Sequence, residues 1–103
     1  MVGVALLEKE IQKQVLNYLQ YKGIFNWRNN TGAAKIEGGG FVRFGSVGSP
    51  DIFAVKNGKV WGIEVKTAKG ELSQYQKHWG ELFSNAGGIY VVVRSLDEIM
   101  KIL

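Results

Sequence analysis

Two carboxylates and a lysine near the middle of the chain have the residue types and spacing of a metal-dependent hydrolytic centre. Asp51 and Glu64 lie at the outer ends of two apolar, strand-like segments, and Lys66 follows Glu64 by two residues. The segments are joined through Asn57-Gly58, and Asn-Gly between apolar segments is the strongest short-range signal for a hairpin with a two-residue loop. This loop predicts a register in which Asp51 faces Glu64.

The predicted register brings the three ionisable groups to one end of the hairpin. Directly opposed side chains in an antiparallel pair have Cβ atoms about 4.5–5.5 Å apart, and Lys66 shares the face of Glu64 because side chains alternate along a strand. Two carboxylates this close repel each other unless a cation lies between them. We therefore expect Asp51 and Glu64 to bind a divalent metal ion, with the backbone carbonyl of Val65 as a further oxygen ligand.

The composition restricts which metal such a centre can hold. The chain contains no cysteine and a single histidine, His78, which excludes a cysteine-based or multi-histidine zinc site. The expected ion is a hard cation with oxygen ligands, Mg²⁺ or Mn²⁺. Such an ion polarises a phosphodiester oxygen and lowers the pKa of a bound water. The Lys66 ammonium would either lower the pKa of this water further or stabilise charge developing on the phosphate.

The same residues also permit a purely structural interpretation. Glu-x-Lys is a common tripeptide, and Lys66 would form a surface ion cluster with the two acids if no metal were bound. A bulge or a three-residue loop in the hairpin would shift the register and separate Asp51 from Glu64.

The elements that position these residues follow from the apolar pattern. Both faces of the hairpin are largely apolar, which requires helices on both sides of the sheet. Apolar residues recur at helical spacing before the Gly23 stop and again after Ser73, and Ser95 can cap a last short helix. The segment 29–40 is too rich in glycine for regular structure. The pattern predicts helices over 7–22, 73–84 and 96–103, and strands over 24–27, 41–44, 51–55, 60–65 and 89–93.

Two helical stripes define the expected packing faces. The first helix would bury Leu7, Ile11, Val15, Tyr18 and Leu19, and the second would bury Tyr75, Trp79, Leu82 and Phe83. We expect Trp61, Trp79 and Tyr90 to belong to the core and His78 to lie at the surface. The fold class that follows is α/β, with a small mixed β-sheet flanked by helices.

Length and charge limit the number of domains and the class of binding partner. The 103 residues are enough for one domain with one core, spanning 1–103. Thirteen Lys and Arg residues against nine Asp and Glu residues give a formal net charge of +4, which mildly favours polyanionic partners. The N-terminal residues lack the basic segment of a signal peptide, and no stretch reaches the length of a membrane span, so we expect a soluble, intracellular protein without a membrane partner.

The catalytic motif and its surroundings resemble a known family. Pro50-Asp51 followed by Glu64-Val65-Lys66 matches the signature of the PD-(D/E)xK nuclease superfamily. The segments 27–32, 45–52, 63–67 and 70–76 make the chain similar to the virus-type replication-repair nuclease (VRR-NUC) domain in its minimal stand-alone form. The resemblance covers nearly the whole chain.

The resemblance implies a restriction-endonuclease-like core of the kind seen in Holliday-junction resolvases. It implies a Mg²⁺- or Mn²⁺-dependent DNA endonuclease that cuts branched DNA, such as Holliday junctions, as a homodimer, consistent with the two symmetric cuts that a four-way junction needs. It also implies a role in DNA replication or repair, with a helicase as a possible partner. The location would be the cytoplasm of a bacterium, or of the host for a phage-encoded protein.

Two further site residues follow from the resemblance. The family places an acid on the first helix near the metal; Glu8 fits this position best, and Glu10 is the alternative. Gln76 matches a glutamine that the family places beside the catalytic lysine. Ser73-x-x-Gln76 is also a capping box, and we expect that a single amide cannot satisfy both roles at full geometry.

Basic residues outside the motif are candidates for DNA contacts. Phosphate contacts from Lys and Arg give affinity without sequence readout, as a structure-selective enzyme requires. The candidates are Arg28, Lys35, Arg43, Lys69 and Lys77. Two other functions stay open: a catalytically inactive DNA-binding module of a larger assembly, and a nuclease for flapped, nicked or single-stranded DNA.

Overall fold

A computed structural model describes residues 5–29 and 32–103 of the chain. The elements in chain order are α1 (Glu8–Tyr21), β1 (Phe25–Arg28), β2 (Gly32–Lys35), β3 (Phe41–Phe44), β4 (Ile52–Lys56), β5 (Lys59–Val65), α2 (Gln74–Asn85), β6 (Ile89–Val93) and α3 (Leu96–Met100). No helix in the described ranges is long and apolar enough to cross a membrane.

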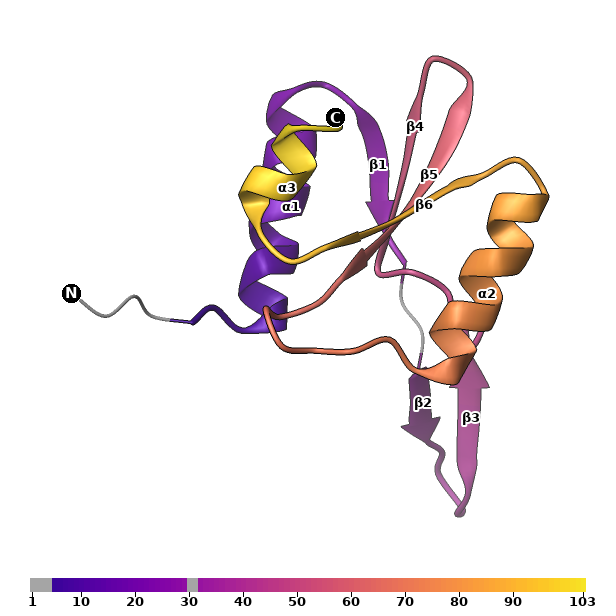
Figure 1. The fold of residues 1–103 in the computed structure, drawn as a ribbon. Coiled ribbons are helices and arrows are strands. Elements are labelled where there is room, and N and C mark those ends of the chain that lie inside the picture. The colour runs from indigo at the N-terminus through magenta and orange to yellow at the C-terminus, as the bar shows by residue number, and fades with distance from the viewer. Residues whose placement is uncertain (1–4, 30–31) are drawn as a thin grey trace.

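The centre of the molecule is a four-stranded mixed sheet. Its strand order is β1-β4-β5-β6, with β4 antiparallel to both β1 and β5, and β6 parallel to β5. Helices α1 and α3 lie on one face of the sheet and α2 lies on the other (Figure 1). The predicted α/β class, with a small mixed sheet flanked by helices, is therefore confirmed.

The central hairpin has the predicted register. Lys56 faces Lys59, Ala54 faces Trp61, and Ile52 faces Ile63, where the ladder ends. Asn57 and Gly58 have positive φ angles of 53° and 76°, as a two-residue turn of the primed type requires. The turn chemistry thus fixes the register on which the position of Asp51 and Glu64 depends.

The core lies between the sheet and the α1–α3 layer. Ile11, Val15 and Leu19 form the buried stripe of α1 and are at most 2% exposed. They pack with the inward side chains of β4 and β5 and with Ile99 of α3. Tyr18 is partly buried as predicted, whereas Leu7 is exposed because it precedes the helix as its N-cap residue.

The packing face of α2 contains half of the predicted stripe. Trp79 and Phe83 are half-buried and contact the Phe53 ring of β4, as predicted. Tyr75 and Leu82 are 70% and 56% exposed, and the buried helical residue is Gly80. A Cβ atom at Gly80 would lie 2.8 Å from the Tyr90 ring, so the absence of a side chain lets α2 approach β6 closely. The apolar pattern missed Gly80 because it gives no weight to glycine.

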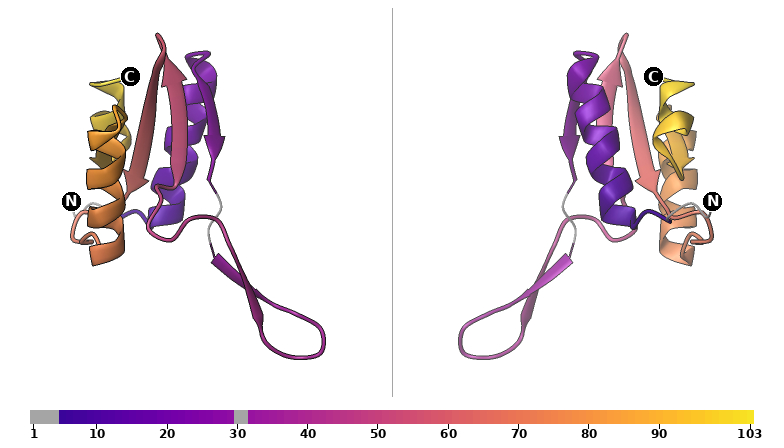
Figure 2. Two further views of the ribbon diagram at one scale, coloured as in Figure 1. Left: turned by 90° about the vertical axis from the view of Figure 1, so that its right-hand side faces the viewer. Right: turned by 90° about the vertical axis from the view of Figure 1, so that its left-hand side faces the viewer.

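The segment 29–40 was predicted to lack regular structure, and this prediction is wrong for part of it. β2 pairs with β3 in an antiparallel hairpin, with Gly32 facing Phe44 and Lys35 facing Phe41. Gly38, Gly39 and Gly40 have positive φ angles, so the glycines form the turn rather than preventing the strands. This β2–β3 arm extends away from the sheet and helices (Figure 2). Residues 30 and 31 lie outside the described part of the chain.

Candidate metal centre

Asp51 is held at the point where the β4–β5 ladder stops. Its Oδ2 accepts a hydrogen bond of 2.8 Å from the Val65 N–H, so the carboxylate takes the place of a backbone acceptor at the end of β5. On the other side, the Asp51 carbonyl accepts a bond of 2.7 Å from the Asn29 N–H. The Asn29 amide also donates to the Pro50 carbonyl at 2.9 Å and to Ser49 Oγ at 2.8 Å. The backbone around Asp51 is therefore fixed from both neighbouring strands.

Glu64 is a buried acid with an unused oxygen. The residue is 1% exposed, and its Oε1 accepts a hydrogen bond of 3.1 Å from Gln76 Nε2. Its Oε2 is buried and has no hydrogen-bond partner among the described residues. An unpaired buried polar atom costs about 1–3 kcal/mol, and a cation bound at Oε2 would remove this cost.

Three carboxylates converge at this place. Glu8, Asp51 and Glu64 each offer an oxygen, and the three oxygens lie within 4.8 Å of one another. Glu8 reaches the group because it is the first residue of α1. The alternative acid, Glu10, is engaged elsewhere, since its Oε1 accepts a bond of 2.9 Å from the Leu7 N–H and so caps the helix. Of the two candidates on the first helix, the structure brings Glu8 to the other acids.

The protonation of Glu64 reflects this environment. Burial raises the pKa of Glu64 most, and the negative charge of Asp51 raises it further. The positive charge of Lys66 lowers the pKa, and the net value is about 9. The protein without metal therefore keeps a proton on Glu64 near neutral pH. A bound cation would displace this proton, since ligating carboxylates must be ionised.

Gln76 performs two functions that were expected to compete. Its Oε1 accepts a bond of 2.8 Å from the Ser73 N–H, and its backbone N–H donates to Ser73 Oγ at 3.2 Å, which completes the capping box of α2. Its Nε2 is left to donate to Glu64. The expectation that one amide cannot do both is wrong, because the oxygen serves the cap and the nitrogen serves the acid.

Lys66 and Val65 are the remaining site residues predicted from the Glu64-Val65-Lys66 motif. The Lys66 N–H donates to the Val93 carbonyl at 3.0 Å, which extends the β5–β6 pairing, and its half-buried side chain lies close enough to affect the pKa of Glu64. Val65 contributes its N–H to Asp51. Its carbonyl as a metal ligand stays a prediction.

Arg94, which the sequence pattern did not identify, holds the loop between Lys66 and α2. Nη1 of Arg94 donates to the carbonyls of Thr67 and Gly70, both at 2.6 Å, and to that of Ala68 at 3.4 Å. Asn29 was also missed as the support of Asp51. The available signals were an arginine directly after a β-branched strand and an Asn-Asn-Thr-Gly loop, but neither indicates its partner.

The predicted DNA-contact residues come from different elements, and their contact with DNA stays a prediction. Arg28, Lys35, Lys69 and Lys77 are exposed, but they lie on β1, on the β2–β3 arm, on the loop after β5 and on α2, respectively. Arg43 belongs to β3, and its side chain lies outside the described part of the structure. His78 is exposed, as expected.

Tyr90 is a partly buried residue near the acids. Burial raises its pKa most, and the charges of Glu64 and Asp51 raise it further. Its hydroxyl has no hydrogen-bond partner among the described residues. Trp61 packs against the core, and Trp79 and Tyr90 are half-buried in the layer between α2 and the sheet, which agrees with their expected role.

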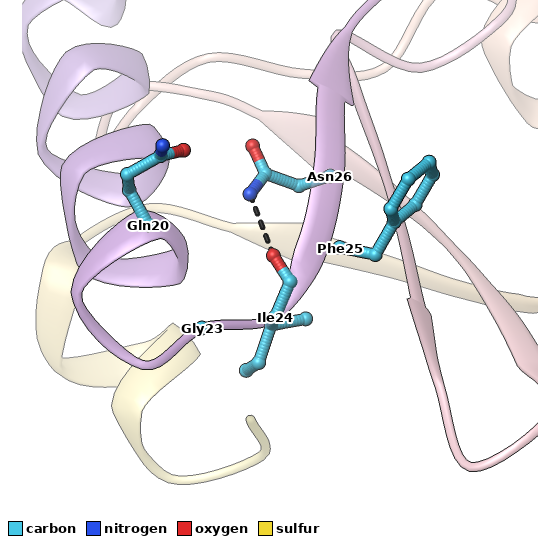
Figure 3. A pocket seen from close by; sticks show the side chains of 5 residues that line it. All are labelled: Gln20, Gly23, Ile24, Phe25 and Asn26. Atoms are coloured by element: carbon cyan, nitrogen blue, oxygen red, sulfur yellow. Dashed lines mark hydrogen bonds between the residues drawn. The ribbon is translucent and has the colours of Figure 1, made fainter.

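The donor set fits a hard divalent cation. Three carboxylates offer oxygen ligands, which Mg²⁺ and Mn²⁺ prefer, and the unpaired Oε2 of Glu64 lies in a buried position that a cation would satisfy. The cluster lies at the Asn29 end of β1. It is separate from the hollow at the start of β1, which is lined by Gln20, Gly23, Ile24, Phe25 and Asn26 (Figure 3).

Comparison with known proteins finds similar solved structures but no matching sequence family. No family profile matches the chain, and no curated protein sequence matches it. A solved structure described as a VRR_NUC domain superposes with a TM-score of 0.66 at 23% sequence identity, over 91% of this chain and 90% of the other. This chain therefore has the fold of that domain over nearly its whole length.

Proposed function

We propose that this chain is a VRR-NUC-type nuclease, a metal-dependent endodeoxyribonuclease that hydrolyses phosphodiester bonds in DNA. The observation that carries the proposal is the convergence of Glu8, Asp51 and Glu64 around a buried carboxylate oxygen that has no partner among the described residues. The fold it shares with a domain whose name denotes a nuclease supports the same conclusion. The residues 1–103 would form a single nuclease domain.

Each residue has a distinct part in the proposed mechanism. Asp51, Glu64 and Glu8 would hold Mg²⁺ or Mn²⁺, with the Val65 carbonyl as a further ligand. When bound, the ion supplies Lewis acidity toward the phosphodiester and lowers the pKa of an attacking water. Lys66 places a positive charge next to the reacting phosphate and stabilises the charge that develops there. Gln76 donates from Nε2 to Glu64 Oε1, which would leave Glu64 Oε2 available to hold the ion.

We further propose branched DNA, such as a Holliday junction, as the substrate and a homodimer as the acting form. A junction needs two symmetric cuts, and one chain offers one centre, so a twofold dimer supplies the second. The protein would act in the cytoplasm of a bacterium or of a phage host, in replication or repair, with a helicase as a possible partner. A net charge of +4 supports binding to a polyanion.

The test is cleavage of a labelled panel containing a four-way junction, a flap, a nicked duplex and a linear duplex. The reactions contain Mg²⁺, Mn²⁺ or EDTA. Lys66→Ala is compared with Lys13→Ala, which removes an exposed lysine of α1 that is not among the candidate site residues. We expect metal-dependent, paired cuts in the junction, abolished in Lys66→Ala and retained in Lys13→Ala.

Other outcomes would change the proposal in defined ways. Cleavage restricted to flaps or single strands would keep the chemistry and replace the substrate. Junction binding without cleavage in any metal would indicate an inactive DNA-binding module. Full activity of Lys66→Ala would refute the assigned centre.

A further inference from the structure

Asp51 follows a β-turn in the loop that joins β3 to β4. We call residues 46–50 the 46–50 turn. The Ser49 N–H and the Ser49 hydroxyl both donate to the Ser46 carbonyl, at 3.0 Å and 2.6 Å. Ser49 is 8% exposed, and Pro50 is fully buried. The 46–50 turn therefore has a fixed shape, and the position of Asp51 depends on the contacts that hold this turn in place.

Helix α2 contacts one side of the 46–50 turn. Trp79 Nε1 donates to Ser46 Oγ at 3.2 Å. Gly48 has a positive φ angle of 85°, and a Cβ atom at this residue would clash with the Tyr75 carbonyl group. Glycine is favoured here because it has no side chain to meet the α2 backbone and because it adopts a positive φ angle without strain. The 46–50 turn is thus packed closely against the first turn of α2.

Asn29, which follows the edge strand β1, joins the 46–50 turn to the sheet. Its Nδ2 donates to Ser49 Oγ at 2.8 Å and to the Pro50 carbonyl at 2.9 Å, and these two bonds use both hydrogens of the amide nitrogen. The Asn29 N–H donates to the Asp51 carbonyl at 2.7 Å. Three consecutive residues, including the candidate metal ligand, are therefore bonded to one asparagine.

We propose that Asn29 is a positioning residue of the candidate metal centre and places the Asp51 carboxylate for metal binding. This inference rests on the proposed nuclease function and adds to it a residue that acts through Asp51. Asn29 fixes the backbone that carries the Asp51 side chain, and the Val65 N–H bonds to Oδ2 of that side chain. Functional groups must be held within about 0.5 Å of their productive positions, so a small shift of this backbone should weaken metal binding.

A purely structural role for Asn29 would have different consequences. Loss of its amide would then lower the stability of the whole fold, and amides that exchange through unfolding would lose protection together. If Asn29 positions Asp51, the loss is local to the hydrogen bond that the Asp51 carboxylate accepts. The Val65 N–H donates to Asp51 Oδ2 at 2.8 Å and so reports on Asp51. The neighbouring Lys66 N–H donates to the Val93 carbonyl at 3.0 Å and serves as the reference.

The first measurement is amide hydrogen exchange by NMR in EDTA, so that it depends on neither metal nor cleavage. Asn29→Ala removes the side-chain amide and keeps the backbone bond to Asp51. Asn26→Ala is the matched control, because Asn26 is a half-buried asparagine of β1 whose Nδ2 donates to the Ile24 carbonyl near the other end of the strand. Ser49→Ala removes one acceptor of the Asn29 amide and carries the test if Asn29→Ala does not fold. Mn²⁺ affinity is then measured by calorimetry, and DNA cleavage by single-turnover and steady-state kinetics.

We expect Asn29→Ala to accelerate exchange of the Val65 amide about tenfold or more, with exchange of the Lys66 amide changed less than about twofold. The Mn²⁺ affinity of Asn29→Ala should fall about tenfold or more, as for other residues that orient a metal ligand. The kcat for cleavage should fall by a similar factor, while KM for DNA stays within about twofold of the wild-type value. Ser49→Ala should show the same pattern with smaller changes, and Asn26→Ala should match the wild type.

Two results would overturn the inference. Unchanged exchange at Val65, or equal acceleration of the Val65 and Lys66 amides, would show that Asn29 does not position Asp51. Unchanged Mn²⁺ affinity despite selective loss of Val65 protection would show that this positioning has no effect on the metal site. A wild-type protein that binds no Mn²⁺ and cuts nothing would refute the proposed function instead, and selective loss of Val65 protection in Asn29→Ala would then still assign the positioning of Asp51 to Asn29.

Discussion

Glu64 combines burial, an acidic neighbour and an unpaired oxygen in a single side chain. Its pKa is raised to about 9, first by burial and then by the charge of Asp51. In the metal-free protein the proton on Glu64 removes the charge repulsion with Asp51. A protonated Glu64 cannot bind a metal ion, so the proton must leave when a metal binds. The stability of the metal-free protein should therefore depend on the protonation of this residue.

Replacing Glu64 by glutamine should stabilise the metal-free protein at pH 8. A carboxyl with a raised pKa contributes stability below the unfolded-state value of 4.5, and loses it as the pH rises through the folded-state value of about 9. In EDTA at pH 8, Glu64→Gln should raise the free energy of unfolding by about 1 kcal/mol. For a domain of this size, this corresponds to an increase of about 4–8 °C in Tm.

The pH dependence provides the internal check on this prediction. At pH 4 the melting temperatures of Glu64→Gln and wild type should coincide, because Glu64 is protonated in both states. Glu81→Gln, an exposed substitution on α2, should have no effect at either pH. A lower Tm for Glu64→Gln at pH 8 would contradict the raised pKa.

Gln76→Glu separates the two functions of Gln76. A glutamate can still accept the Ser73 N–H bond and is favoured in a capping box, but it has no N–H to donate to Glu64. We expect Tm to change by less than about 3 °C, while single-turnover cleavage falls about 10- to 100-fold, as for other residues that orient a metal ligand. Wild-type cleavage by this variant would show that the bond to Glu64 has no catalytic value.

At the scale of the elements, prediction succeeded where a local signal specifies the geometry. Asn57-Gly58 determined the hairpin register, and Gly23, Ser73 and Ser95 marked helix ends within one or two residues. In the interface between α2 and the sheet, Trp79 and Phe83 were predicted correctly, but Gly80 was not, because close packing at a glycine has no apolar signature. The Arg94 and Asn29 contacts join residues more than twenty positions apart, and spacing within one segment cannot reveal them.

Gly80→Ala tests the close approach of α2 to β6. Alanine is favoured over glycine in a helix by about 1 kcal/mol, but its Cβ would lie 2.8 Å from the Tyr90 ring. Overpacking of this kind costs about 1–3 kcal/mol, so we expect net destabilisation of about 1 kcal/mol in urea unfolding. Ser84→Ala, at an exposed position of the same helix, should be neutral or stabilising. A stabilised Gly80→Ala would show that α2 can move outward without cost.

At the scale of the whole molecule, the β2–β3 arm makes the chain less compact than a typical domain of its length. The radius of gyration is 14.9 Å, against about 13 Å for a compact chain of 100 residues. The arm exposes Phe41 and Ile36 and carries Lys35. Its strands pair with each other and do not join the central sheet, so the arm should contribute little to the stability of the core.

Shortening the arm should therefore separate stability from DNA binding. Ala33 faces Arg43, so residues 34–42 can be replaced by Asn-Gly, which closes a shorter hairpin. We expect Tm to stay within about 2 °C of wild type, consistent with surface changes of at most about 0.5 kcal/mol. If Lys35 contacts phosphate, the salt dependence of DNA affinity should decrease by about one charge. A large loss of Tm would show that the arm supports the core.

The bond between Asp51 Oδ2 and the Val65 N–H also has a consequence for quality control. The acceptor is supplied by a side chain whose position depends on the strand register, so a hairpin displaced by even one residue would turn Glu64 to the opposite face and leave Asp51 without this donor. Chains with a displaced hairpin would then lack the cluster of acids. The proposed nuclease activity would therefore be confined to chains whose central hairpin has the native register.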